Sequence, residues 1–188
     1  RGTAGAVVDG EIGLFFRSHV MLQSLTVIGR IRFNGSNDIS VIDCDITATA
    51  ARNGDGIVSF LRAERAWIAG NTVTGLTSWA ETSLGASGNN LGEGILVNGP
   101  GHVIEGNTVR GFRDAISFME DAEAEDQFSI DVLDNDISVA ADDGIEADFC
   151  FHNCRIVGNR LRNVFIAFSS QPSLGGPTWF LRNRAYNV

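Results

Sequence analysis

The stretch Ile156-Val157-Gly158-Asn159-Arg160-Leu161 decides the fold, because variants of it return along the whole chain. The related stretches span 68–73, 104–109, 132–137 and 180–185, and a degenerate one at 41–46 has Cys44 in place of the asparagine. The asparagines are Asn71, Asn107, Asn135, Asn159 and Asn183, so the last two intervals are both 24 residues and the earlier ones, 36 and 28, must carry insertions. Self-similarity at such a period indicates a repeat architecture, here with six turns of one unit.

A second phrase recurs between the asparagines as Asp55-Gly56-Ile57, Glu93-Gly94-Ile95, Asp114-Ala115-Ile116 and Asp143-Gly144-Ile145. Each copy opens a short run with apolar residues at alternate positions, a period that is typical of strands. We therefore expect three short strands per repeat, each pairing in parallel with its counterpart one repeat away.

Inward-facing residues of such strands should stack in columns. We expect one column of Ile57, Ile95, Ile116, Ile145 and Ile166, and another of Val73, Val109, Ile137 and Leu161. The repeated asparagine should occupy a tight turn, where its amide can bond to the asparagine of the next repeat.

These stretches resemble those of the right-handed parallel β-helix proteins, the pectate-lyase-like superfamily, whose repeats carry the same G-N-x-[IV] phrase. The resemblance covers roughly residues 35 to 188. It implies an all-β, right-handed, single-stranded parallel β-helix solenoid of about six to seven coils, with three short strands per coil. The right hand follows from the resemblance alone. We expect residues 1–188 to form a single β-helix domain within a longer chain, with loop insertions at 76–92 and 119–127.

Charge and composition narrow the classes of partner. The chain of 188 residues has 14 basic residues, all arginine, against 23 acidic ones, which gives a formal net charge of -9. Such a field repels nucleic acid, so we expect no nucleic-acid partner. No run approaches the roughly 18 apolar residues that span a bilayer, so we expect no membrane span. The short spacing of Cys150 and Cys154 is compatible with either a local disulfide or two thiols.

The acidic residues that open the first strand of each repeat should lie along one edge, on neighbouring strands about 4.8 Å apart. They are Asp55, Glu93, Asp114 and Asp143. One interpretation is that each aspartate simply caps a turn. The other is functional: like charges at this spacing raise at least one pKa, or a cation or sugar hydroxyls fill the groove.

The densest acidic segment, 142–148, supplies the catalytic candidates Asp143, Glu146 and Asp148. If Ile145 and Ala147 point inward, Glu146 and Asp148 share the outer face of one strand and can act as acid and base. The polygalacturonase branch of the superfamily also uses an adjacent aspartate pair, which 142–143 resembles.

The other candidates are ligand-binding residues: Asp55, Glu93, Asp114, Trp79 and Arg62. Trp79 lies in the first insertion, where it can stack on a sugar ring or anchor the loop. Arg62, like Arg65, Arg113 and Arg155, could neutralise a sugar carboxylate. Both insertions should flank the acidic strands and wall a groove, since long loops concentrate function.

We therefore predict an extracytoplasmic, carbohydrate-active protein that binds a polysaccharide or glycan and hydrolyses it in an acidic groove. A non-catalytic module for glycan binding, adhesion or assembly is the alternative, and a polysaccharide lyase or epimerase is a weaker one because lysine is missing. No cofactor is expected, although calcium would suit the acidic segments. Another chain or chain segment is expected to cover the C-terminal end.

Overall fold

The protein is all-β in the computed structural model, which describes residues 6–171 and 176–188. The described residues form eighteen strands and three short 3-10 helices. In chain order the elements are β1 (Val7–Gly13), β2 (Ser18–Gln23), β3 (Thr26–Arg32), β4 (Asn37–Ile42), β5 (Asp45–Thr47), η1 (Ala50–Arg52), β6 (Ile57–Val58), β7 (Trp67–Ala69), β8 (Thr72–Thr74), η2 (Glu81–Ser83), β9 (Glu93–Val97), β10 (Val103–Glu105), β11 (Thr108–Phe112), β12 (Asp114–Phe118), η3 (Asp121–Glu123), β13 (Asp131–Leu133), β14 (Asp136–Glu146), β15 (Cys154–Val157), β16 (Arg160–Ser169), β17 (Thr178–Leu181) and β18 (Arg184–Tyr186).

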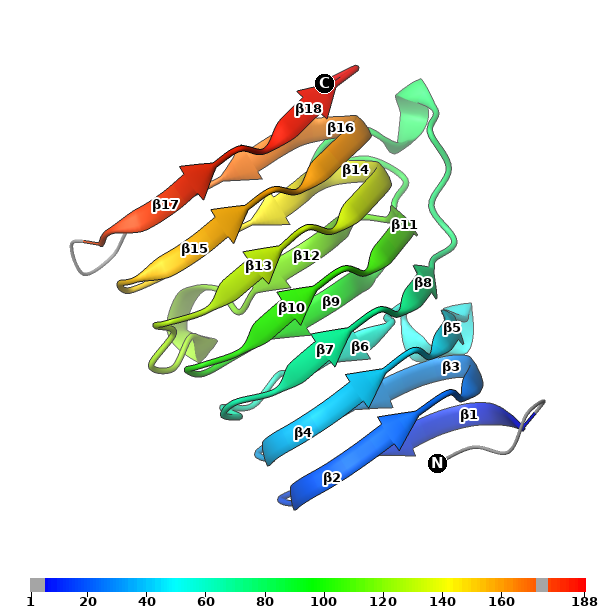
Figure 1. Ribbon diagram of the computed structural model, residues 1–188. Coiled ribbons are helices and arrows are strands. Elements are labelled where there is room, and N and C mark those ends of the chain that lie inside the picture. The colour runs from blue at the N-terminus through cyan, green and yellow to red at the C-terminus, as the bar shows by residue number, and fades with distance from the viewer. Residues whose placement is uncertain (1–5, 172–175) are drawn as a thin grey trace.

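The strands form two sheets, and every named pairing is parallel. The smaller sheet has seven strands in the order β17-β15-β13-β10-β7-β4-β2. Figure 1 shows these strands side by side along one face, with each repeat of the sequence adding one strand. Residues one repeat apart are therefore spatial neighbours.

The larger sheet has eleven strands and closes on itself. Its order is β11-β8-β5-β3-β6-β9-β12-β14-β16-β18, with β1 on β3, and β14 also pairs with β11. A closed, eight-stranded parallel barrel thus forms beside the seven-stranded sheet. Its strands, in order, are β11, β8, β5, β3, β6, β9, β12 and β14. The predicted fold class, a single-stranded right-handed β-helix solenoid with three separate strands per coil, is therefore wrong, and so is the β-helix repeat description built on it.

The physical reason for this correction lies in the long strands. The expectation placed a turn between the strand after each asparagine and the strand after each acidic residue. Instead β14 runs unbroken, pairing with β11 through Ala140 and with β12 at Ile145 and Glu146. A register shift between Ala140 and Asp143 accommodates the bend, as an irregular β-bulge does. Sequence periodicity does not distinguish a bent strand from two strands and a turn.

One of the two expected columns is confirmed in full and the other in part. Val73, Val109, Ile137 and Leu161 are partners on neighbouring strands, and all are fully buried. In the other column Ile57, Ile95, Ile116 and Ile145 are in register, but the partner of Ile145 is Phe168. Ile166 instead pairs with Asp143 and is 40% exposed, because the irregularity in β14 shifts the register.

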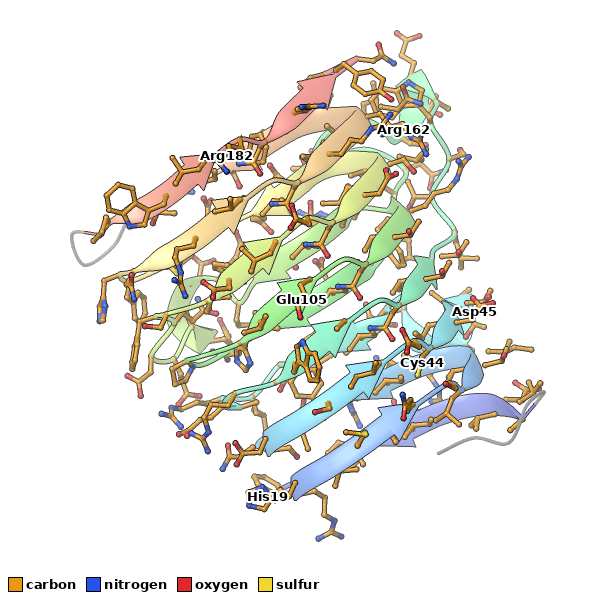
Figure 2. All side chains as sticks on the ribbon, viewed as in Figure 1. His19, Cys44, Asp45, Glu105, Arg162 and Arg182 are labelled. Carbon is orange, nitrogen blue, oxygen red and sulfur yellow. A yellow bond between two sulfur atoms is a disulfide. The ribbon has the colours of Figure 1, made fainter. Side chains whose placement is uncertain are left out.

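The expected asparagine ladder is confirmed. The side-chain amide nitrogen of each asparagine donates to the side-chain oxygen of the next, at 2.9–3.0 Å, from Asn71 to Asn183. The same oxygen also accepts the backbone N–H of the preceding asparagine. Cys44 occupies the equivalent turn between β4 and β5 (Figure 2), and its backbone N–H donates to Asn71.

The glycine of the second phrase is needed because neighbouring strands approach closely there. We expect Gly94→Ala to lower the free energy of unfolding by about 2 kcal/mol, as overpacking does, because an added Cβ would lie 2.4 Å from the carbonyl oxygen of Ala115. Ala115→Gly, at the equivalent position on the adjacent strand, should cost about 0.5–1 kcal/mol. Denaturant unfolding of both variants measures the difference, and equal losses would contradict the close-approach explanation.

Candidate functional site

An open groove crosses the outer face of the larger sheet. Two adjoining hollows form it, because Phe60, Glu93 and Arg113 line both. One hollow continues to Met119 and Glu120 of the second insertion. The other continues to the first insertion, which contributes 86, 88 and 90–92. Both insertions thus wall the groove, and Figure 1 shows them at opposite ends of β9 and β12.

Three carboxylates converge on the floor of the groove. Glu93, Asp114 and Glu146 each place an oxygen within 4.8 Å of the other two, an arrangement that could hold a metal ion. They come from three adjacent strands, β9, β12 and β14. Asp114 is the register partner of Glu93, and Ser117 is that of Glu146. Residues 93 and 114 are 21 positions apart in the chain, and residues 114 and 146 are 32 positions apart. Parallel pairing of the strands makes them neighbours in space.

The hydrogen-bond environments of Glu93 and Asp114 differ. Ser117 Oγ donates to Glu93 Oε2 at 2.6 Å. Asp114 Oδ1 accepts the backbone N–H of Asp143 at 2.8 Å, and Arg113 Nε lies 3.3 Å from Asp114 Oδ2. These contacts favour the charged form of Asp114 more than the single neutral donor, Ser117, favours that of Glu93.

The pKa values of these carboxyl groups separate in the same way. Burial, reinforced by the charge of Asp114, raises the pKa of Glu93 to about 8. Burial raises the pKa of Asp114 to about 6, opposed by the Asp143 N–H and Arg113. Burial and the charge of Asp114 raise the pKa of Glu146 to about 10. Near neutral pH the group therefore holds an ionised aspartate beside two protonated glutamic acids.

The first acidic residue of the series, Asp55, belongs to a buried ion pair. Arg30 Nη1 donates to Asp55 Oδ2 at 2.8 Å, and Arg30 Nε donates to Glu11 at 2.6 Å. Asp55 lines the second hollow but is only 4% exposed. Sequence reasoning missed Arg30, whose partners lie 19 and 25 residues away and carry no local signal.

Two of the three predicted catalytic residues, Asp143 and Asp148, line neither hollow of the groove. Asp143 is 6% exposed and lies with Asp114 and Asp142 in a second acidic cluster. Burial, followed by the charges of Asp114 and Asp142, raises its pKa to about 7. Asp148 is 5% exposed and lies with Glu120 and Glu146 in a third cluster. Of the three, Glu146 alone lines either hollow.

Trp79 and Arg62 lie outside the groove. Trp79 is 37% exposed in the first insertion, and no hollow described includes it. Arg62 pairs with Glu64 and Asp126. The related arginines are also engaged, Arg65 with Asp38 and Glu64, and Arg155 with Asp131. Arg113 is the one arginine among the residues described as lining the hollows.

The second insertion contributes Glu120, which lines the first hollow and lies near Glu146 and Asp148. Cys150 and Cys154 form a disulfide, so the local-disulfide alternative is the correct one. It closes the segment that follows Asp148, and His152 of that segment stacks on Phe128 with ring centroids 4.9 Å apart. Phe151 N–H also donates to the carbonyl of Gln127. The end of the second insertion and the disulfide loop therefore pack as one unit.

Comparison with known proteins assigns no role to the residues of the site, so their chemistry is inferred from the geometry of the site. Among the described residues no helix has the length and apolar character to cross a membrane. No protein-family model matches the chain, and neither a curated protein nor a solved structure matches it.

Proposed function

We propose that this protein binds a polysaccharide in the acidic groove and hydrolyses its glycosidic bonds, with Glu93 as general acid and Asp114 as nucleophile. The observation that carries the proposal is the convergence of two in-register carboxylates on adjacent strands, in contrasting environments, at the floor of an open groove. Paired carboxyl groups whose surroundings separate their pKa values take acid and base roles in glycoside hydrolysis.

The separation of the two groups favours retention of configuration. Retaining enzymes place their carboxyl groups roughly 5–5.5 Å apart and inverting enzymes roughly 6.5–9.5 Å apart. Glu93 and Asp114 have oxygens within 4.8 Å. Glu93 would donate its proton to the leaving glycosidic oxygen while an oxygen of Asp114 bonds to the anomeric carbon. A water, losing its proton to Glu93, would then displace Asp114 and restore both groups.

The charge of the groove points to neutral or cationic sugars. Arg113, the one guanidinium among the residues described as lining it, is already paired with Asp114 and Asp142, so it is not free to pair with a sugar carboxylate. A uronate polymer would bring further negative charge, which disfavours the lyase and epimerase alternative.

The Cys150–Cys154 disulfide supports an oxidising, extracytoplasmic location. If the protein binds a metal ion, calcium suits the acidic residues best, since hard cations prefer oxygen ligands.

The test is a hydrolysis screen with neutral, amino-sugar and uronate polysaccharides. Asp114→Asn and Glu93→Gln are each expected to lower kcat at least 100-fold, a typical contribution of acid–base groups. Asp45→Asn removes an exposed carboxylate of β5 outside the groove and should leave kcat unchanged. Azide added to Asp114→Ala should restore turnover and yield a glycosyl azide.

Several outcomes would reject hydrolysis. Full activity in both groove variants, with unfolding midpoints matching the wild type, would remove Glu93 and Asp114 from the mechanism. Binding of a glycan without turnover under any condition would favour the non-catalytic binding module. A failure to bind any of the three polymer classes would reject the carbohydrate proposal itself.

A further inference from the structure

The acidic cluster of Glu120, Glu146 and Asp148 joins two separate parts of the chain. Glu120 belongs to the second insertion, Glu146 ends β14, and Asp148 follows it. Their carboxylate oxygens lie within 4.8 Å of one another. Among the described residues none of the three forms a salt bridge. Arg113, which lines the same hollow, pairs with Asp114 and Asp142 instead. Three carboxylates are thus gathered without a protein cation.

Two buried acceptor oxygens, one on Asp148 of the cluster and one on Gln127 of the same insertion as Glu120, lack a donor. Asp148 is 95% buried, and its Oδ1 has no hydrogen-bond partner in the described part of the chain, while its Oδ2 accepts from Gln171 Nε2 at 2.7 Å. Gln127 is fully buried, and its Oε1 likewise has no partner there. A buried acceptor left unpaired is costly, so each of these oxygens points to a missing donor or cation.

The amide of Gln127 is anchored between the segments that carry the cluster. Its Nε2 donates to the carbonyl of Met119 at 2.7 Å and to that of Phe149 at 3.0 Å. Met119 precedes Glu120 and Phe149 follows Asp148. The amide of Gln127 therefore joins the backbone next to Glu120 to the backbone next to Asp148. Hard cations such as calcium take a mixture of carboxylate and amide oxygens, completed by water.

We propose that Glu120, Glu146 and Asp148 bind a calcium ion that fastens the 119–127 insertion to the end of β14. The ion would be held by the carboxylate oxygens of the cluster and would offer its remaining positions to water on the groove side, where Glu120 and Glu146 line the hollow. The site shares Glu146 with the floor of the groove but uses neither Glu93 nor Asp114, so calcium binding and hydrolysis can be measured separately. Its effect is to hold one wall of the groove in place.

Titration of chelator-treated, full-length protein with calcium chloride, without any sugar, tests the proposal. Calorimetry should show one site, and saturating calcium should raise the unfolding midpoint. Asp148→Asn and Glu120→Gln should each weaken calcium binding at least tenfold. Glu125→Gln makes the same charge change in the same insertion, at an exposed residue outside the cluster, and should bind calcium as the wild type does. Terbium luminescence, competed by calcium, gives a second readout.

Three results would overturn the proposal. They are no heat and no change in unfolding midpoint up to millimolar calcium, equal binding by Asp148→Asn and the wild type, and equal weakening in Glu125→Gln and Glu120→Gln. In the first case a water molecule or a proton shared by the carboxyl groups would account for the cluster. Calcium binding by a protein that hydrolyses no polysaccharide would support this site and reject the proposed function, because the ion uses neither Glu93 nor Asp114.

Discussion

Replacing Asn135 with alanine is expected to lower the free energy of unfolding by roughly 5 kcal/mol, because each buried polar group left unpaired costs about 1–3 kcal/mol. Asn135 Oδ1 accepts both the backbone N–H and the side-chain amide of Asn107. Its own amide donates to the carbonyl of Ile104 and to Asn159 Oδ1. The alanine variant therefore strands two donors and one acceptor in a layer where the asparagines are about 1% exposed.

Asn183→Ala provides the matched control for this prediction. Asn183 makes the same type of bonds, accepting twice from Asn159 and donating to Ile156, but it is only partly buried. Water can replace the lost partners there, so we expect a loss of about 1–2 kcal/mol. Urea unfolding of both variants measures the two values. Equal losses would show that the ladder contributes through backbone geometry and not through buried hydrogen bonds.

Raising the pH from 6.5 to 8.5 with a chelator present is expected to lower the free energy of unfolding by about 4–5 kcal/mol. The pKa values of Glu93 and Glu146 are about 8 and about 10 in the folded protein, above the ordinary value of 4.5. Between the ordinary value and the raised value of each group, the folded state holds more protons than the unfolded state. The free energy of unfolding therefore falls as the pH rises through this range. His102, whose pKa burial lowers to about 4, acts in the opposite direction only below its ordinary value of 6.5.

Thermal unfolding at the two pH values measures this effect, with an expected fall of about 8–20 °C in the midpoint for a chain of this size. Glu146→Gln cannot ionise and should reduce the pH dependence, making the variant more stable than the wild type at pH 8.5. Glu81→Gln, an exposed change in the first insertion, should leave the pH dependence intact. A wild-type midpoint that rises with pH would contradict the buried, protonated glutamic acids.

The repeating phrases were sufficient to predict the strands, their parallel pairing and the asparagine ladder. The ladder follows from one position per repeat, so the pairing of Asn107 with Asn135 could be predicted from their equivalent places in neighbouring repeats. The closure of the larger sheet could not be predicted. It depends on β14 continuing as one strand through the register shift between Ala140 and Asp143, and nothing in the alternation of apolar residues distinguishes that irregularity from a turn.

The acidic groove could likewise be predicted from the sequence only in part. The sequence by itself determined that Glu93 and Asp114 would share an edge, because equivalent positions of neighbouring repeats lie side by side in a parallel sheet. Only the tertiary structure decided that Asp55 would be neutralised by Arg30, that Asp143 and Asp148 would be buried, and that Glu120 would join Glu146. Those contacts depend on loops and on partners with no fixed spacing. The repeat sets the register of the strands, whereas the charge and exposure of each carboxylate depend on what packs over the sheet.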